Sequence, residues 1–99
     1  MESFKLSLSD YFKFSSGSTA LVGIMLPADY PIITSDRYIV EIRSNSGKCH
    51  RFKNINEDIF VRTADAPKSD LRSLQTFENI DDFLKAMKDD PIFLYGYKK

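Results

Sequence analysis

The most reactive side chains of the chain stand next to each other, because its single cysteine, Cys49, precedes its single histidine, His50. A cysteine nucleophile requires a histidine within hydrogen-bond reach of its sulfur. Neighbouring residues on a strand point to opposite faces of a sheet, so these side chains are not expected to meet. We interpret Cys49 as buried and His50 as solvated. One cysteine and one histidine cannot form a zinc site without several carboxylates, and the sequence predicts no metal and no other cofactor.

Adjacent carboxylates are a second candidate for chemistry. Neighbouring side chains on a helix diverge by about 100°, so such pairs do not form the acid–base dyad of a glycosidase. Asp81 and Asp82 instead favour the start of a helix, where negative charge is stabilised. We found no catalytic motif, and we therefore expect a protein that is not an enzyme. The adjacent carboxylates are Glu57-Asp58, Asp81-Asp82 and Asp89-Asp90.

Four cations lie on one predicted hairpin, and no acidic residue separates Ile42 from Glu57. A basic hairpin that also carries an aromatic residue is typical of a surface that contacts phosphates. Exposed edge strands also carry lysine and arginine simply to prevent pairing with other sheets, which is the more common reason for such a pattern. The candidate nucleic-acid-binding residues are Arg43, Lys48, Arg51 and Lys53.

Two further pairs of residues are candidates for binding a protein. Tyr95 and Tyr97 lie two positions apart in the predicted last strand, so they share a face, and exposed tyrosines anchor many interfaces. Half-burial at the rim of a barrel is their more common role. Asp81 and Asp82 belong to an acidic helix that suits a basic partner or the basic hairpin of a second copy, so a homo-oligomer stays open.

Short segments with the alternation of half-buried strands occupy most of the chain. Ser9-Asp10 separates the first two segments, and Ser44 to Gly47 is predicted to be a hairpin turn in which Gly47 supplies the positive φ. Residues 54–58 are predicted to form a turn, and residues 63–75 a loop with a helical turn near 70–74. The predicted strands are residues 4–8, 11–14, 19–26, 38–43, 49–52, 59–62 and about 92–97.

The clearest helix spans about residues 79–90, where apolar residues recur at helical spacing from Ile80 to Met87. Asn79 suits the N-cap, and Pro91 ends the helix. Several short strands followed by one capping helix and a final strand predict a mainly β fold, either a small antiparallel barrel or a curled sheet. The predicted core consists of Leu6, Phe14, Leu21, Ile24, Val40, Ile42, Phe60, Phe83, Leu84 and Met87.

Composition restricts the class of protein further. A chain of 99 residues and 11.4 kDa predicts a single domain over residues 1–99. Its 14 basic and 14 acidic side chains cancel, which disfavours a strongly basic nucleic-acid-binding protein. No disulfide can form within the chain, and its first twenty residues lack the apolar run of a signal peptide. The longest apolar run, residues 21–26, is too short to cross a membrane, so we expect a cytoplasmic protein without membrane contact.

Part of the chain resembles a known family. An aromatic segment at residues 11–14 leads through Ser16-Gly17-Ser18 into an apolar segment that contains Gly23, and Ser35-Asp36 precedes the strand at 38–42. Over residues 4–62 this pattern resembles the β-barrel second domain of translation elongation factors. The resemblance implies a six-stranded Greek-key barrel that contacts RNA or another domain. It implies no GTP hydrolysis, because no nucleotide-binding motif is present.

By elimination, the sequence favours a non-enzymatic module that binds another protein, and it predicts an exposed apolar or aromatic patch for that contact. One alternative is an RNA-contacting barrel that uses the basic hairpin, residues 43–53, and whose binding weakens steeply with salt. The other is a small enzyme of unrecognised class, which requires a pocket with a perturbed titrating group. A buried Cys49 with no pocket around His50 would nearly eliminate that enzyme.

Overall fold

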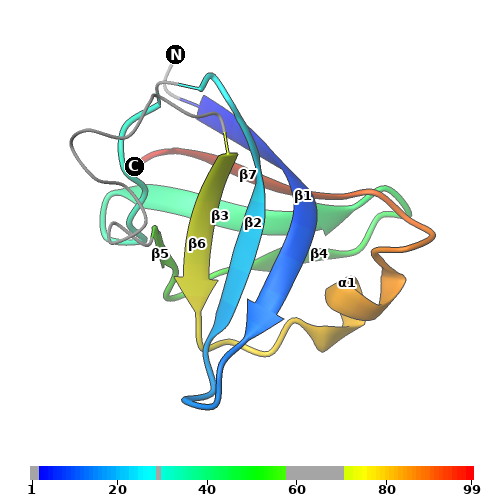
Figure 1. Cartoon of the computed structure of the whole chain (residues 1–99). Coiled ribbons are helices and arrows are strands. Elements are labelled where there is room, and N and C mark those ends of the chain that lie inside the picture. The colour runs from blue at the N-terminus through cyan, green and yellow to red at the C-terminus, as the bar shows by residue number, and fades with distance from the viewer. Residues whose placement is uncertain (1–2, 29, 58–70) are drawn as a thin grey trace.

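The computed structural model describes residues 3–28, 30–57 and 71–99, and their strands form one antiparallel sheet that curls into a half-barrel (Figure 1). The seven strands lie in the order β4-β3-β7-β1-β2-β6-β5. The predicted fold class is confirmed: a mainly β domain with a C-terminal helix and a final strand. The elements are β1 (Ser3–Lys13), β2 (Thr19–Leu26), β3 (Tyr38–Ser44), β4 (Cys49–Arg51), β5 (Asn56–Glu57), β6 (Leu71–Thr76), α1 (Asp81–Ala86) and β7 (Ile92–Lys98).

Two hairpins form where the sequence predicts them, and a tight turn that contains a glycine joins the strands of each one. Gly17 lies between β1 and β2 with φ of 97°, and Gly47 lies between β3 and β4 with φ of 107°. Both values are in the region that side chains avoid, so glycine is required there. β7 then pairs with β3 on one side and with β1 on the other, which joins the two hairpins into a single sheet.

A β-bulge in β1 explains one error in the predicted core. The strand runs through Ser9-Asp10 without ending, but its register against β2 shifts between Leu8 and Asp10. Leu6 lies inside the half-barrel, and a regular strand would place Phe14 on that same face. The extra residue reverses the alternation, so Phe14 points outward and its side chain is 46% exposed. The prediction that Phe14 is in the core is therefore wrong.

Strand β2 explains a second error. Its largely apolar sequence is typical of a strand buried on both faces. Thr19, Leu21, Gly23 and Met25 are buried on the inner face, whereas Ile24 and Leu26 on the outer face are exposed. Ile24 points to the outer face, where it is 37% exposed, so its predicted place in the core is wrong. Gly23 marks a close backbone approach, since a Cβ atom there would lie 2.1 Å from the carbonyl oxygen of Ser7.

The interior of the half-barrel is filled by apolar side chains from every strand except β4 and β5, from the loops and from α1. Of the predicted core, Leu6, Leu21, Val40, Ile42, Phe83 and Leu84 are buried, Met87 packs against the core while partly exposed, and Phe60 lies outside the described residues. The core is completed by residues that were not in the predicted core: Phe4, Met25, Tyr30, Ile33, Tyr38, Phe52, Ile55, Leu74, Ile80, Ile92 and Leu94.

The region after the second hairpin differs most from the prediction. The predicted turn at 54–58 contains β5, and residues 71–75 of the predicted loop belong to β6, where a helical turn was expected near 70–74. The rest of that predicted loop, residues 63–70, lies outside the described residues. Arg72 conceals the alternation of β6, because this charged residue lies on the inner face between β5 and the loop after β2. The predicted strand at 59–62 lies outside the described residues.

A fully buried ion pair joins β6 to β5. The Arg72 and Glu57 side chains are both 0% exposed, with 2.5 Å from Nε to Oε2 and 2.7 Å from Nη2 to Oε1. Arg72 also donates to the carbonyl oxygens of Ala28 and Pro31, and Glu57 accepts the backbone N–H of Ile33. The pair therefore holds the loop after β2 against the inner face of the sheet.

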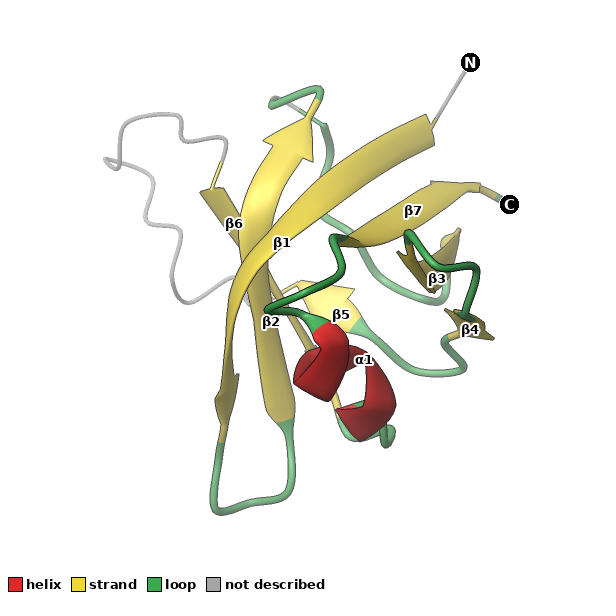
Figure 2. Cartoon of the chain, turned by 90° about the vertical axis from the view of Figure 1, so that its right-hand side faces the viewer, coloured by secondary structure: helices red, strands yellow, loops and turns green. Residues whose placement is uncertain are grey.

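Helix α1 lies across one end of the half-barrel (Figure 2). It comprises only six residues, not the predicted 79–90, because the chain after Ala86 continues as turns before Pro91. Ile80 occupies the N-cap position without a side-chain cap, although Asn79 still accepts the backbone N–H of Asp81. Phe83 and Leu84 are its buried residues, so the short helix closes the core at this end.

Candidate functional site

The outer face of the sheet brings charged and aromatic side chains from four strands into one row. In the strand register Arg51 lies opposite Glu41, Glu41 lies opposite Tyr95, and Tyr95 lies opposite Lys5. Because alternate residues share a face, Arg43 on β3 belongs to the same surface. We call this surface the cation–aromatic face and define it by Lys5, Glu41, Arg43, Arg51, Phe93, Tyr95 and Tyr97.

Glu41 is the centre of this surface. One of its oxygens lies 2.6 Å from Nη2 of Arg43, and the other lies 2.9 Å from Nη2 of Arg51. The hydrogen bonds from Arg43 and then from Arg51 outweigh the effect of burial and hold the pKa of Glu41 below its usual range. Glu41 in turn raises the pKa of both arginines. The carboxylate is 11% exposed whereas the guanidinium side chains are half-exposed, so their outer edges face solvent.

Two cations cover the aromatic rings beside this cluster. Nζ of Lys5 lies 4.3 Å from the centroid of the Phe93 ring and 5.7 Å from that of Tyr95. The guanidinium carbon of Arg43 lies 5.0 Å from the Tyr95 centroid. These are cation–π distances. No carboxylate of the described chain forms an ion pair with Lys5, which leaves its charge available to a ligand.

An open groove of about 740 Å³ crosses this surface from β3 to the end of β2. Arg43 and Tyr95 line one side, Lys5 lies along its length, and Leu26 and Pro27 form the other side. Leu26 is 58% exposed and lies opposite Lys5 in the register of β1 and β2. The groove therefore connects the charged half of the outer face with an apolar half.

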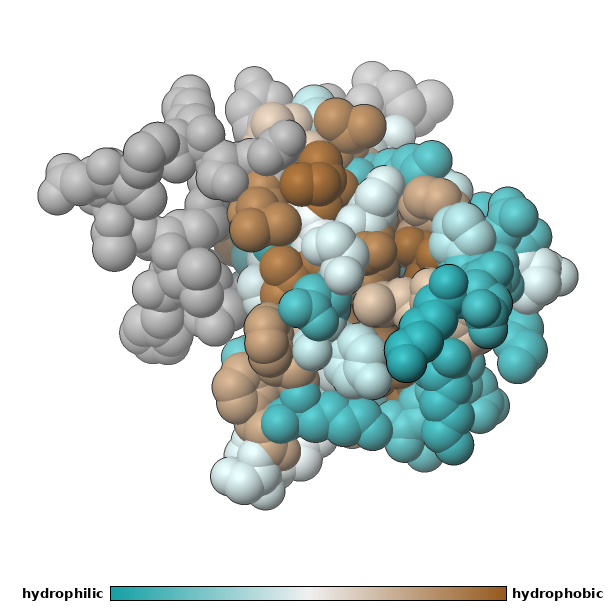
Figure 3. Space-filling view, turned by 45° about the vertical axis from the view of Figure 1, so that its right-hand side comes forward, coloured by the Kyte–Doolittle hydropathy of each residue, from teal (hydrophilic) through white to brown (hydrophobic). Residues whose placement is uncertain are grey.

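The apolar half covers β1, β2 and β6. In the register of these strands Ile24 lies opposite Leu71, and both are exposed. Phe12 lies on the same outer face, and Phe14 and Phe77 extend it at the ends of β1 and β6. The space-filling view shows apolar atoms in a band over β1 and β2, beside a hydrophilic surface at α1 (Figure 3). We call this surface the apolar face and define it by Phe12, Phe14, Ile24, Leu26, Leu71 and Phe77.

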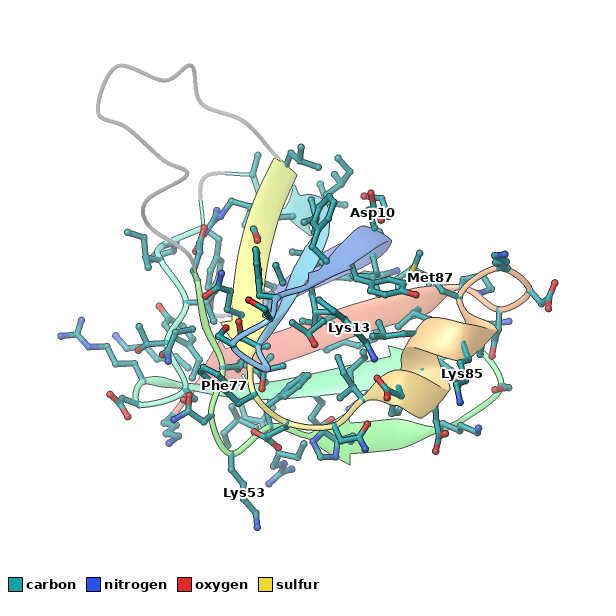
Figure 4. The ribbon with its side chains drawn as sticks, turned by 60° about the horizontal axis from the view of Figure 1, so that its bottom comes forward. Asp10, Lys13, Lys53, Phe77, Lys85 and Met87 are labelled. Atoms are coloured by element: carbon teal, nitrogen blue, oxygen red, sulfur yellow. The ribbon has the colours of Figure 1, made fainter. Side chains whose placement is uncertain are left out.

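The predicted nucleic-acid residues separate into two groups. Arg43 and Arg51 meet at Glu41, but Lys48 lies in the turn after β3 and lines a different groove. Lys53 projects away from the sheet, from the loop after β4 (Figure 4). β4 is an edge strand, so its basic residues also fit the edge-protecting role.

The predicted protein-binding residues separate as well. Tyr95 and Tyr97 share the outer face as expected, with Tyr95 half-buried and Tyr97 45% exposed. Asp81 and Asp82 lie at α1, away from these tyrosines, and Asp81 pairs with Lys13, whose side chain extends towards the helix in Figure 4. The four residues therefore do not form one site.

Cys49 and His50 point to opposite faces as predicted, but their burial is the reverse of the prediction. Cys49 is exposed, and its thiol donates to Glu41 at 3.8 Å. His50 is partly buried, with Nε2 at 2.9 Å from Oε1 of Glu78. The prediction of a buried cysteine and a solvated histidine is therefore wrong, because β4 presents Cys49 on the uncovered outer side of the sheet.

A groove of about 640 Å³ borders His50 and runs along α1. Burial alone would raise the pKa of Glu78. Hydrogen bonds with the backbone N–H of Asn54, the His50 side chain and the backbone N–H of Lys53 outweigh burial and hold this pKa below its usual range. A buried Cys49 with no pocket at His50 would nearly have eliminated a small enzyme. The structure instead has an exposed Cys49 and a groove beside His50, so it does not eliminate that alternative. Within the described ranges, no group of three or more histidine, cysteine, aspartate and glutamate side chains could hold a metal ion.

Sequence reasoning missed Lys5, Glu41 and Phe93 as members of a site. The signal for Lys5 was available, because strict alternation from Phe4 to Leu8 places it on the outer face. Glu41 is a carboxylate among the cations, but only the register shows that Arg51 lies opposite it. The pairing of β7 between β1 and β3, which unites these residues, is not encoded in any local pattern.

Comparisons with protein-family models, with curated proteins and with solved structures give no match to this chain. In the part of the chain that the structure describes, no helix has the length and apolar character of a membrane-spanning segment.

Proposed function

We propose that this domain is a non-enzymatic binding module whose outer face binds another protein. The apolar face carries this proposal: six of the eight exposed large apolar side chains of the described residues belong to it. Monomeric proteins rarely expose large contiguous apolar surfaces unless these bind a partner. The sequence favoured a protein partner and predicted an exposed apolar or aromatic patch. The predicted contact residues were Tyr95 and Tyr97 or Asp81 and Asp82 of the acidic helix, and none of them belongs to the apolar face.

The proposed occupant of the apolar face is a different protein. Continuity with the cation–aromatic face supports this choice, since Leu26 lies beside Lys5 at the junction of the two surfaces. In a two-fold symmetric contact of copies through these strands, the cations of one copy would approach the matching surface of the other, where like charges oppose association. A second copy remains the competing occupant, and the experiment below distinguishes it.

Site-specific crosslinking tests the proposed function. A photoreactive phenylalanine analogue replaces Ile24 in one variant and Asn45, an exposed residue of the β3–β4 turn, in the control. Each variant is irradiated in its native lysate, with and without nuclease, and also as purified protein. We expect a discrete protein adduct from position 24 alone, insensitive to nuclease. Equal adducts from both positions would contradict the proposal, and so would adducts of the purified chain with itself alone.

Contact with RNA is the second candidate function. Lys5, Arg43 and Arg51 beside the rings of Phe93 and Tyr95 support it, since cations and aromatic rings together bind single strands. The resemblance of residues 4–62 to the second domain of elongation factors also supports it, because that domain contacts RNA or another domain. Loss of the adduct with nuclease, together with binding that falls steeply with salt, would favour this function over the first.

A further inference from the structure

The groove on the cation–aromatic face continues the apolar face, and its chemistry specifies what a partner must present there. We propose that the groove receives an acidic side chain of the protein partner, flanked by an apolar residue that packs on Leu26 and Pro27. This inference rests on the proposed function and names the partner as an acidic–apolar segment.

Charge complementarity carries the first part of the inference. Lys5, Arg43 and Glu41 line the groove, and Arg51, which lies beside it on the cation–aromatic face, pairs with Glu41. The surface therefore has three positive charges around one described carboxylate. Glu41 already accepts hydrogen bonds from both arginines, so it neutralises about one of the three charges. Lys5 has no such carboxylate within the described chain. An anionic group that approaches from solvent therefore meets an excess of positive charge.

The shape of the groove carries the second part. The charged side of the groove ends at Tyr95, and its other side is formed by the exposed Leu26 and by Pro27. A ligand that places a carboxylate near Lys5 therefore places its neighbouring groups on apolar surface. Successive side chains of an extended segment point in opposite directions. A segment that lies along the groove with alternating acidic and apolar residues can therefore direct its acidic side chains to the charged side and its apolar side chains to Leu26 and Pro27.

The same geometry favours a carboxylate over the phosphates of RNA. Lys5 lies over the Phe93 ring and Arg43 over the Tyr95 ring, so each of these rings already has a cation on one face. Among the described residues, the outer surface beyond Leu26 presents the exposed apolar side chains of Ile24 and Leu71, not cations that could follow a phosphate backbone. Lys48 and Lys53, the other candidate phosphate contacts, belong to different surfaces.

Titration of isotope-labelled protein with two synthetic peptides tests this inference. Both peptides carry the same leucine and phenylalanine residues, with glutamate at the intervening positions of one and lysine in the other. A single-stranded RNA oligonucleotide is the third probe. We expect the acidic peptide alone to shift the amide signals of Lys5, Tyr95 and Gly96, and to bind at least about tenfold more tightly than the basic one.

Charge reversal provides the matched control. Lys5→Glu should remove the preference for the acidic peptide, whereas Lys53→Glu, which changes a lysine outside the groove, should leave it unchanged. Lys5→Gln serves the same purpose if charge reversal disturbs folding. Equal affinity for both peptides, shifts confined to other residues, or shifts of these signals by RNA alone would overturn the inference. The crosslink from position 24 would still be expected after that result, because it does not depend on an acidic segment in the groove. Failure of this inference is therefore distinguishable from failure of the proposed function.

Discussion

Arg72–Glu57 and Glu41–Arg43–Arg51 are two clusters of the same side-chain types on opposite faces of one sheet. The first is completely buried, and its members also bind backbone groups of the loop after β2 and of Ile33. The second has a nearly buried carboxylate whose arginines are half-exposed. Removal of one partner leaves an uncompensated charge in the first case, whereas solvent compensates for it in the second. We infer that the inner pair holds the fold and the outer cluster shapes a binding surface.

The largest effect is expected from Arg72→Met. This change leaves the Glu57 carboxylate buried without its guanidinium partner and should lower the free energy of unfolding by about 3–5 kcal/mol. Urea denaturation followed by circular dichroism measures the loss. A decrease below about 1 kcal/mol would contradict a structural role for the pair.

A second change at the same pair should reverse part of this loss. In Arg72→Met with Glu57→Gln, the isolated buried charge is replaced by a neutral amide whose oxygen can still accept the N–H of Ile33. We expect the double variant to be more stable than Arg72→Met alone in the same denaturation experiment. A double variant that is less stable would show that the uncompensated charge is not the main cost.

Glu41→Gln is expected to have a smaller effect. The amide keeps an oxygen acceptor, and solvent reaches both arginines, so we expect a loss of about 1 kcal/mol or less in the free energy of unfolding. Thermal denaturation beside the Arg72→Met variant makes the comparison direct. Equal losses for the two variants would remove the distinction between the inner and outer clusters.

The smallest effect is a difference in pH dependence. Because the pKa of Glu41 is lowered in the folded state, its contribution to stability is complete above the pKa of the unfolded carboxyl, about 4.3, and is lost as pH falls towards the folded value. Glu78 has a lowered pKa too and contributes in the same direction. Glu41→Gln should therefore lose less stability than wild type between about pH 5 and pH 3. Parallel curves would contradict the coupling of Glu41 to its arginines.

The features that the sequence could predict are those with a local signal. Alternation identified most strands, and the glycine of the β3–β4 turn identified its hairpin, because these signals are local. Alternation failed at the bulge of β1, where one extra residue turned Phe14 outward. It also failed at β6, where Arg72 occupies an inner position that only its distant partner Glu57 makes tolerable.

The candidate site was only half predictable for the same reason. Arg43, Arg51 and Tyr95 were identified by residue type, but as members of two different sites. Their union with Lys5 depends on β7 pairing with both β1 and β3, a contact between segments far apart in the chain. The apolar face was missed because Phe14 and Ile24 were assigned to the core, and apolar sequence alone does not indicate which face of a strand is covered.

The most direct measurement is the affinity of Ile24→Lys for the protein recovered by crosslinking, made together with its free energy of unfolding. Ile24 is on the outer face, so we predict stability within about 0.5 kcal/mol of wild type. We predict at least about tenfold weaker binding, because a charge then lies at the centre of the apolar face. Asn45→Lys, which adds the same charge in the β3–β4 turn, should retain both properties. Wild-type affinity in a stably folded Ile24→Lys variant would contradict the proposal that the apolar face binds the partner.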